Sequence, residues 1–191
     1  MSRLWRLLAI AVLAAALWPE LPRLAAEWRL RAANQQLERA LGGVQQAARQ
    51  GQNGDVAQIR RTAAEGLQLA EQAAPALPGD ARVILARAVG LLLSGRGGDA
   101  ANLLNAAIAR EERPEFTLNL GRARTTLGDT AGADAAYLRT AWASSQATAT
   151  LPKTLREDLQ RRVATLEAQL HAGTLAAPPP LRPQPQPQPQ P

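Results

Sequence analysis

The side chains that could carry chemistry are few and scattered in this sequence. Its 191 residues include one histidine and no cysteine, so it offers no thiolate nucleophile and no His or Cys pair for a metal ion. His171 stands at the end of a predicted helix, where a histidine commonly interacts with the helix dipole. Ser144 and Ser145 have no evident base nearby, and Asp and Glu never follow a metal-loop spacing. We therefore predict that the chain is not an enzyme and has no catalytic residue, metal site or cofactor.

One glycine-rich segment has the composition of a phosphate-binding loop but lacks its other parts. Residues 94–99 have the sequence SGRGGD, with no lysine and no preceding strand. The formal net charge of +6 would suit an anionic partner, yet Arg is mixed with Asp and Glu along the predicted helices. Such mixing is typical of a solvated helix surface. We expect no small-molecule substrate and no nucleic-acid binding.

Composition and hydrophobic spacing together predict an all-α fold. Alanine, leucine, arginine and glutamine dominate, and aromatic residues make up only 3%. These residues favour helix, and apolar positions recur at spacings of three and four along most of the chain. Turn-forming segments divide the pattern into a helical pair over 23–74 and two helical hairpins over 81–113 and 114–147.

The two hairpins resemble each other when they are aligned on their turns. Gly95 and Gly128 are 33 residues apart, and small and large residues recur around them at matching positions. The matched pairs are Ala88 with Gly121, Ala100 with Ala133, and Leu104 with Tyr137. A period of about 33–34 residues in helix–turn–helix units is the signature of a helical solenoid.

This pattern resembles the tetratricopeptide repeat (TPR) family over about residues 81–146, and only weakly over 32–80. The motif residues of the second unit are Leu120, Gly121, Leu127, Gly128, Asp129, Ala133 and Tyr137; those of the first are Ile84, Ala88, Leu91, Gly95, Ala100, Leu104 and Ala107. Four positions depart from the family pattern. Thr117, Arg124 and Thr140 stand where it prefers an aromatic, an aromatic and an alanine. Arg87 replaces the usual leucine. An unrelated antiparallel bundle is the alternative.

The resemblance implies a concave groove that binds a protein partner, either an extended peptide or a helix. In such repeats the first helix of each pair lines the groove. The lining predicted here is Arg82, Leu85, Val89, Leu92, Leu93, Glu115, Leu118, Arg122 and Thr125. Its apolar centre and two arginines suggest a partner with leucine-like anchors and some acidic character. If the helices of 32–74 cover this face, part of it becomes core instead.

The first 22 residues are predicted to form a signal-anchor or transmembrane segment. Arg3 and Arg6 precede an uncharged run over residues 7–19, and Trp5, Arg6 and Trp18 are spaced to lie at the two membrane interfaces. A signal cleaved after the small residues at 14–16 and a buried soluble helix are the alternatives. The basic N-terminus favours a single-pass inner-membrane protein whose C-terminal domain is periplasmic.

The C-terminal part divides into a helix and a tail. Residues 152–171 carry a single apolar stripe that suits a capping helix of the solenoid, or a coiled-coil seam for dimerisation. Residues 172–191 form a Pro- and Gln-rich tail, for which we predict disordered, solvated polyproline II structure. The tail would serve as a spacer or as a peptide that docks on a partner.

These features together predict a membrane-anchored TPR-like scaffold for protein–protein interaction in a bacterial envelope assembly. Polysaccharide export, secretion and respiratory-complex biogenesis are equally compatible with the sequence. The alternative is a small accessory subunit of a larger membrane complex, with the N-terminal helix packed inside that complex.

Overall fold

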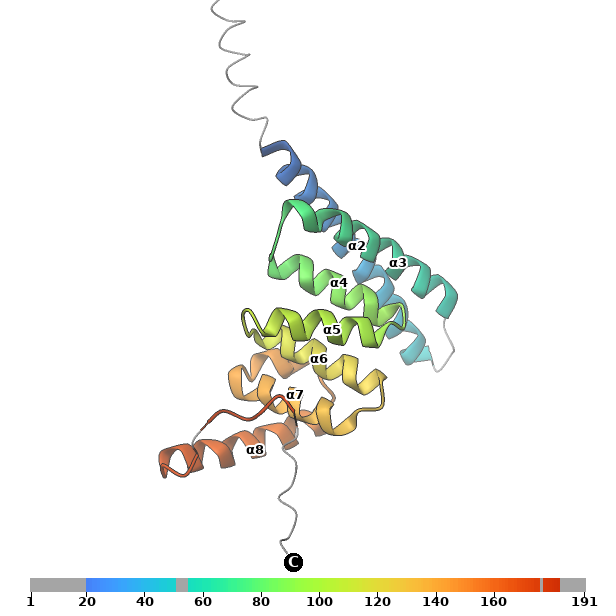
Figure 1. Cartoon of the computed structure of the whole chain (residues 1–191). Helices are drawn as coiled ribbons and strands as arrows, with labels where there is room; N and C mark the ends of the chain where they lie inside the picture. The colour runs from blue at the N-terminus through green and yellow to red at the C-terminus, as the bar shows by residue number, and fades with distance from the viewer. Residues whose placement is uncertain (1–19, 51–54, 176, 183–191) are drawn as a thin grey trace, which may run out of the picture. The chain divides into compact units, whose positions relative to one another are not determined.

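The computed structural model describes residues 20–50, 55–175 and 177–182, and every regular element among them is a helix (Figure 1). This confirms the all-α prediction for the described part of the chain. The contacts divide the chain between Gly90 and Leu91 into two compact units, each with its own set of packed helices.

The first unit is built on a long helical hairpin of α2 (Leu21–Gln50) and α3 (Val56–Ala73). Buried small and large residues alternate along α2, namely Ala26, Leu30, Ala33, Leu37 and Ala40. Asp55 caps α3 by accepting a hydrogen bond of 2.9 Å from the Gln58 backbone nitrogen. Gly66 allows α3 to approach α2 closely, because a Cβ there would lie 2.9 Å from Leu37 Cγ.

A short turn leads from α3 into α4. The 3₁₀ helix η2 (Ala74–Ala76) contains Pro75, and Gly79 takes a positive φ of 75° before α4 (Ala81–Leu93) begins. Gly90 on α4 lies against α3, since a Cβ on it would come within 2.8 Å of Leu67 Cβ. The hairpin and the part of α4 before the division therefore pack into one body.

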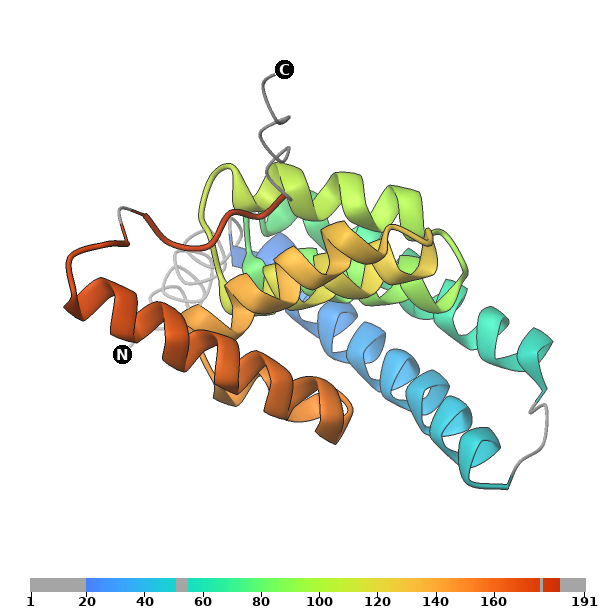
Figure 2. The same cartoon turned by 90° about the horizontal axis from the view of Figure 1, so that it is seen from below.

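The second unit consists of helices that each pack on the next one in the sequence. Their order is α5 (Gly97–Ile108), α6 (Pro114–Thr126), α7 (Thr130–Ala143), the 3₁₀ helix η3 (Gln146–Thr150) and α8 (Lys153–His171). Contacts join α5 to α6, α6 to α7 and α7 to α8. Figure 2 shows the same succession from below.

The turns around Gly95 and Gly128 have the same hydrogen-bond pattern, a Schellman motif. Gly128 has φ of 75°, Gly95 has φ of 79°, and the nitrogen of the following residue bonds to a carbonyl five positions back. These bonds are Asp129 N to Arg124 O at 3.0 Å and Arg96 N to Leu91 O at 2.8 Å. The residue after Gly128 also caps the next helix, because the Asp129 carboxylate accepts from Gly132 N at 2.9 Å.

The core of the second unit lies where α6, α7, η3 and α8 meet. Its buried members are Leu118, Ala133, Tyr137, Ala141, Leu151 and Leu159, with Leu138, Leu155 and Val163 packed against them. The apolar stripe of α8 therefore packs against the core in the first turns of the helix. Leu170, near the end of the helix, is 49% exposed.

Most of the predicted signal-anchor, residues 1–19, lies outside the described residues, and so do Trp5, Arg6 and Trp18. Among the helices that the structure does describe, none combines the length and the apolar character that a membrane span requires. Residues 183–191 of the predicted disordered tail also lie outside the described part.

Candidate interaction site

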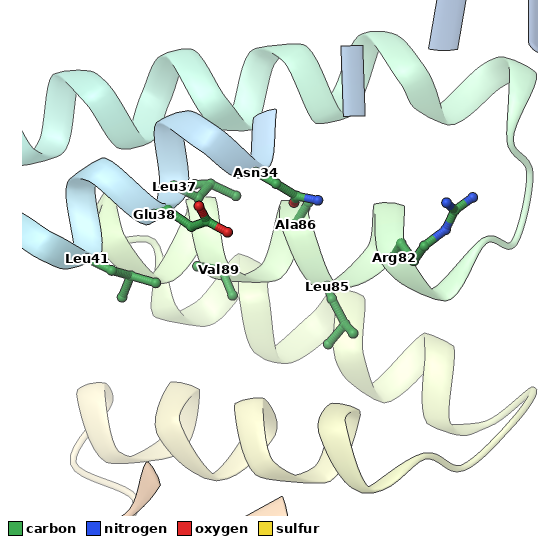
Figure 3. Close-up of a pocket in the computed structure, with 8 residues that line it drawn as sticks. All are labelled: Asn34, Leu37, Glu38, Leu41, Arg82, Leu85, Ala86 and Val89. Atoms are coloured by element: carbon green, nitrogen blue, oxygen red, sulfur yellow. The ribbon is translucent and has the colours of Figure 1, made fainter. Parts of the chain in front are cut away.

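A groove in the first unit runs between α2 and α4 (Figure 3). It has a volume of about 310 Å³ and an apolar surface formed by Leu37, Leu41, Leu85, Ala86 and Val89. Leu41 is 40% exposed, which is unusual for a leucine on a helix face that is otherwise buried. Three of the predicted groove residues, Arg82, Leu85 and Val89, line this groove.

Polar groups border the apolar surface. Asn34 and Glu38 come from α2 and Arg82 from the first turn of α4 (Figure 3). Their amide, carboxylate and guanidinium groups supply hydrogen-bond donors and acceptors at the border of the apolar surface. None of the eight residues that line this groove is a nucleophile paired with a base.

Arg82 is already paired with two carboxylates. Its Nη2 lies 2.6 Å from Asp80 Oδ2 and 2.7 Å from Glu27 Oε1. The hydrogen bond to Asp80, followed by the one to Glu27, raises the pKa of Arg82, and the bond from Arg82 lowers the pKa of Asp80. The sequence had suggested that Arg82 attracts a partner of acidic character. The two carboxylates neutralise the charge of Arg82 locally and therefore weaken this attraction.

A second hollow shares Arg82 with the groove. It has a volume of about 490 Å³ and lies against the first turns of α2 and the turn before α4. Its lining is Glu20, Arg23, Leu24, Glu27, Leu77, Asp80 and Arg82. Arg82 thus lines both hollows, whereas its carboxylate partners Asp80 and Glu27 line only the second one.

The other predicted groove residues belong to the second unit, and several of them make contacts inside it. Leu118 on α6 is only 7% exposed because it packs in the core beside Leu151 and Leu159. Thr125 is exposed, and its hydroxyl lies 3.2 Å from the Tyr137 hydroxyl and donates to Gly121 O at 2.9 Å. Glu115 is exposed in the first turn of α6, and Leu92 is half-buried near the end of α4.

Arg122 on α6 is held by neighbouring side chains. It donates from Nη2 to Thr150 Oγ1 at 2.7 Å and from Nη1 to Asn119 Oδ1 at 3.1 Å. Burial lowers the pKa of Arg122, while the nearby Tyr137 opposes this shift. Because Thr150 lies in η3, the segment that follows α7 covers part of the α6 face that was predicted to line the groove.

The sequence did not identify two features of the structure. The wall formed by Asn34, Glu38 and Leu41 was missed because the groove was predicted from the first helices of the two clear repeats alone. Leu41 was the signal that could have found it, because it continues the helical apolar spacing of Leu37. The environment of the buried Arg124 was also missed, because its partners come from distant parts of the sequence.

The described residues contain no cluster of three or more His, Cys, Asp or Glu side chains placed to hold a metal ion. Comparisons with protein-family models, with curated proteins and with solved structures gave no match.

Proposed function

We propose that this chain is a membrane-anchored scaffold of TPR-like helical repeats that binds a protein partner in a bacterial envelope assembly. The groove between α2 and α4 is the observation that carries the proposal. It combines an open apolar surface of about 310 Å³ with a polar border, which fits one or two apolar anchor side chains of a peptide or helix.

The repeat proposal is supported by the second unit. Its helices pack in sequence order. Two helices end in Schellman turns of the same geometry, at Gly95 and at Gly128, which are 33 residues apart. Gly121 also lies against Tyr137 at the α6–α7 crossing, where a Cβ would come within 2.4 Å of the ring. Close helix crossings at small residues are what stacked helical hairpins require.

The anchor and its orientation are proposed from the sequence of residues 1–22. A reporter that is active only outside the cytoplasm, fused after Pro191, should be active. A fusion of the same chain to a cytoplasm-specific reporter should be inactive. The opposite pair of results would place the two units in the cytoplasm.

The binding surface can be tested by site-specific photocrosslinking in membranes. A crosslinker at Leu41, on the groove, should yield a discrete adduct, whereas one at Leu170, an exposed leucine on α8, should not. Leu41→Arg should then abolish the adduct formed from a crosslinker at Val89, with Leu170→Arg as the matched control. Adducts of equal yield at both leucines, or an adduct insensitive to Leu41→Arg, would remove the groove from the proposal.

A further inference from the structure

Part of the proline-rich tail lies on the surface of the second unit. After α8 ends, Gly173 takes a positive φ of 70° and the chain turns back (Figures 1 and 2). Residues 177–182 then pass beside the α6–α7 hairpin, and Pro179 is buried while its neighbours Pro178 and Pro180 are exposed. The sequence had predicted a solvated tail here. The reason for the difference is that two arginines supply donors for carbonyls that have no partner within the tail.

These two arginines bond to alternate carbonyls of the tail. Arg139 on α7 donates from Nη1 to Pro179 O at 3.3 Å, and Arg124 on α6 donates from Nη1 to Leu181 O. A polyproline II segment has no internal hydrogen bonds, so all of its carbonyls are available to such donors. Carbonyls two residues apart lie roughly 6 Å apart at the rise of this helix, which suits readout by two separate side chains.

Contacts within the unit hold both arginines in place. Arg139 forms a two-point ion pair with Glu112, from Nε to Oε1 at 2.5 Å and from Nη2 to Oε2 at 2.7 Å. Arg124 is 7% exposed, and its Nη1 also donates to Gly132 O at 2.9 Å. Since these side chains are fixed by groups outside the tail, little conformational entropy is lost when a ligand binds to them.

We propose that the α6–α7 hairpin carries a binding site for extended proline-rich segments, which residues 177–182 of the same chain occupy. A proline-rich segment of a partner protein binds there by displacing the tail. The site recognises backbone carbonyls through Arg124 and Arg139, and it recognises proline through the buried position of Pro179. It is separate from the groove between α2 and α4.

Displacement of the tail has a measurable consequence for affinity. A tethered segment competes at an effective concentration of about 1 mM. For a free peptide whose dissociation constant is about 0.1 mM, this competition weakens the apparent affinity roughly tenfold. The native protein should therefore bind such a peptide more weakly than a protein whose tail has been disabled.

The experiment measures fluorescence anisotropy of a labelled peptide, Ala-Pro-Pro-Pro-Leu-Arg, with the purified full-length protein. The variant Pro178→Ser/Pro179→Ser/Pro180→Ser, which disables the tail, should bind the peptide about tenfold more tightly than the native chain. Adding Arg139→Ala to that variant should remove most of the gain. Arg161 is an exposed arginine that pairs with Asp158 within α8. Arg161→Ala in the same variant should leave the gain in affinity unchanged.

A second measurement varies only the ligand, so that folding of the protein is not at issue. A peptide with the Pro179→Ser change should bind the disabled-tail protein at least fivefold more weakly than one with Pro178→Ser. Equal affinities of these two peptides, or equal binding of the native peptide to native and disabled-tail proteins, would overturn the proposal.

Discussion

The hydroxyl groups of Thr117 on α6 and Thr140 on α7 lie 2.8 Å apart in the core of the second unit. Each hydroxyl also lies within hydrogen-bond distance of a backbone carbonyl of its own helix, Pro114 O at 3.0 Å and Ala136 O at 2.9 Å. Two hydroxyl protons are available for these three contacts, so at most two are made at any moment. Two of the four residues that depart from the TPR-like pattern thus form one polar contact across the helix pair.

We expect the two threonines to behave as a coupled pair. Thr117→Val and Thr140→Val should each destabilise the protein by about 1 kcal/mol, because each removes a buried hydrogen bond. The double variant should cost less than the sum of the singles by about 0.5–1 kcal/mol, since each single variant already removes the one contact between the two hydroxyls. Urea unfolding of the four proteins measures this difference. Strict additivity would contradict the pairing.

Gly121 should tolerate no side chain, because of its contact with Tyr137. A Cβ at Gly121 would lie 2.4 Å from Tyr137 Cε1, and the ring, 8% exposed, has little room to move. Gly121→Ala should therefore cost about 1–3 kcal/mol.

Gly42 provides the matched control, because it lies inside α2 and a Cβ added to it would have no other atom within 4 Å. Gly42→Ala should stabilise the protein by up to about 1 kcal/mol, because alanine is the better helix former. Thermal unfolding compares the two variants. Similar shifts in both would mean that the α6–α7 crossing is looser than its geometry indicates.

Leu159 should anchor α8 to the rest of the second unit. It has no exposed surface and packs with Leu118, Tyr137 and Leu151. Leu159→Ala should cost about 2–5 kcal/mol through lost burial and the cavity that remains. Leu170→Ala, on the same helix but 49% exposed, should change the stability by less than about 0.5 kcal/mol. The midpoint of urea unfolding reports both changes, and equal values would show that α8 does not depend on this core.

The ion pair of Glu112 and Arg139 should make stability depend on pH in the acidic range. The hydrogen bonds from Arg139 lower the pKa of Glu112 in the folded protein. A lowered carboxyl pKa contributes stability that is fully present above the unfolded-state value of about 4.3 and is lost as the pH falls through the folded-state value.

The test compares the native protein with Glu112→Gln by unfolding at pH 7 and at successively lower pH. The native protein should be the more stable at pH 7, and its advantage should shrink as the carboxyl group becomes protonated. Glu167→Gln on the exposed face of α8 is the control for the loss of one charge. A difference between native and Glu112→Gln that stays constant down to pH 3 would contradict the role of this ion pair.

Local signals in the sequence were enough to predict the helices and the turns between them. The turn around Gly128 was predicted because a glycine there interrupts the helical pattern, and glycine enters the positive-φ region freely. The structure adds that Asp129 caps the next helix. The sequence matched Gly121 with Ala88 as a small residue of the repeat, and the structure shows that Tyr137 is the residue that Gly121 contacts.

The sequence did not determine which apolar face stays open. A stripe at helical spacing shows that one side of a helix is apolar, but which partner covers it depends on contacts far along the chain. Leu118 became core because η3 and α8 pack on α6 and α7, whereas Leu85 and Val89 line a groove beside α2.

The partners of the polar residues were also decided by tertiary structure alone. Arg124 and Arg139 occupy ordinary helix positions in the sequence, and their carbonyl acceptors lie 57 and 40 residues further along the chain. The sequence determined the helical character of the described elements, because helix formation follows from the local preferences of each residue. Only the folded chain brought the tail beside two arginines whose Nη1 groups donate to its carbonyls, because that contact depends on how α6, α7 and α8 pack together.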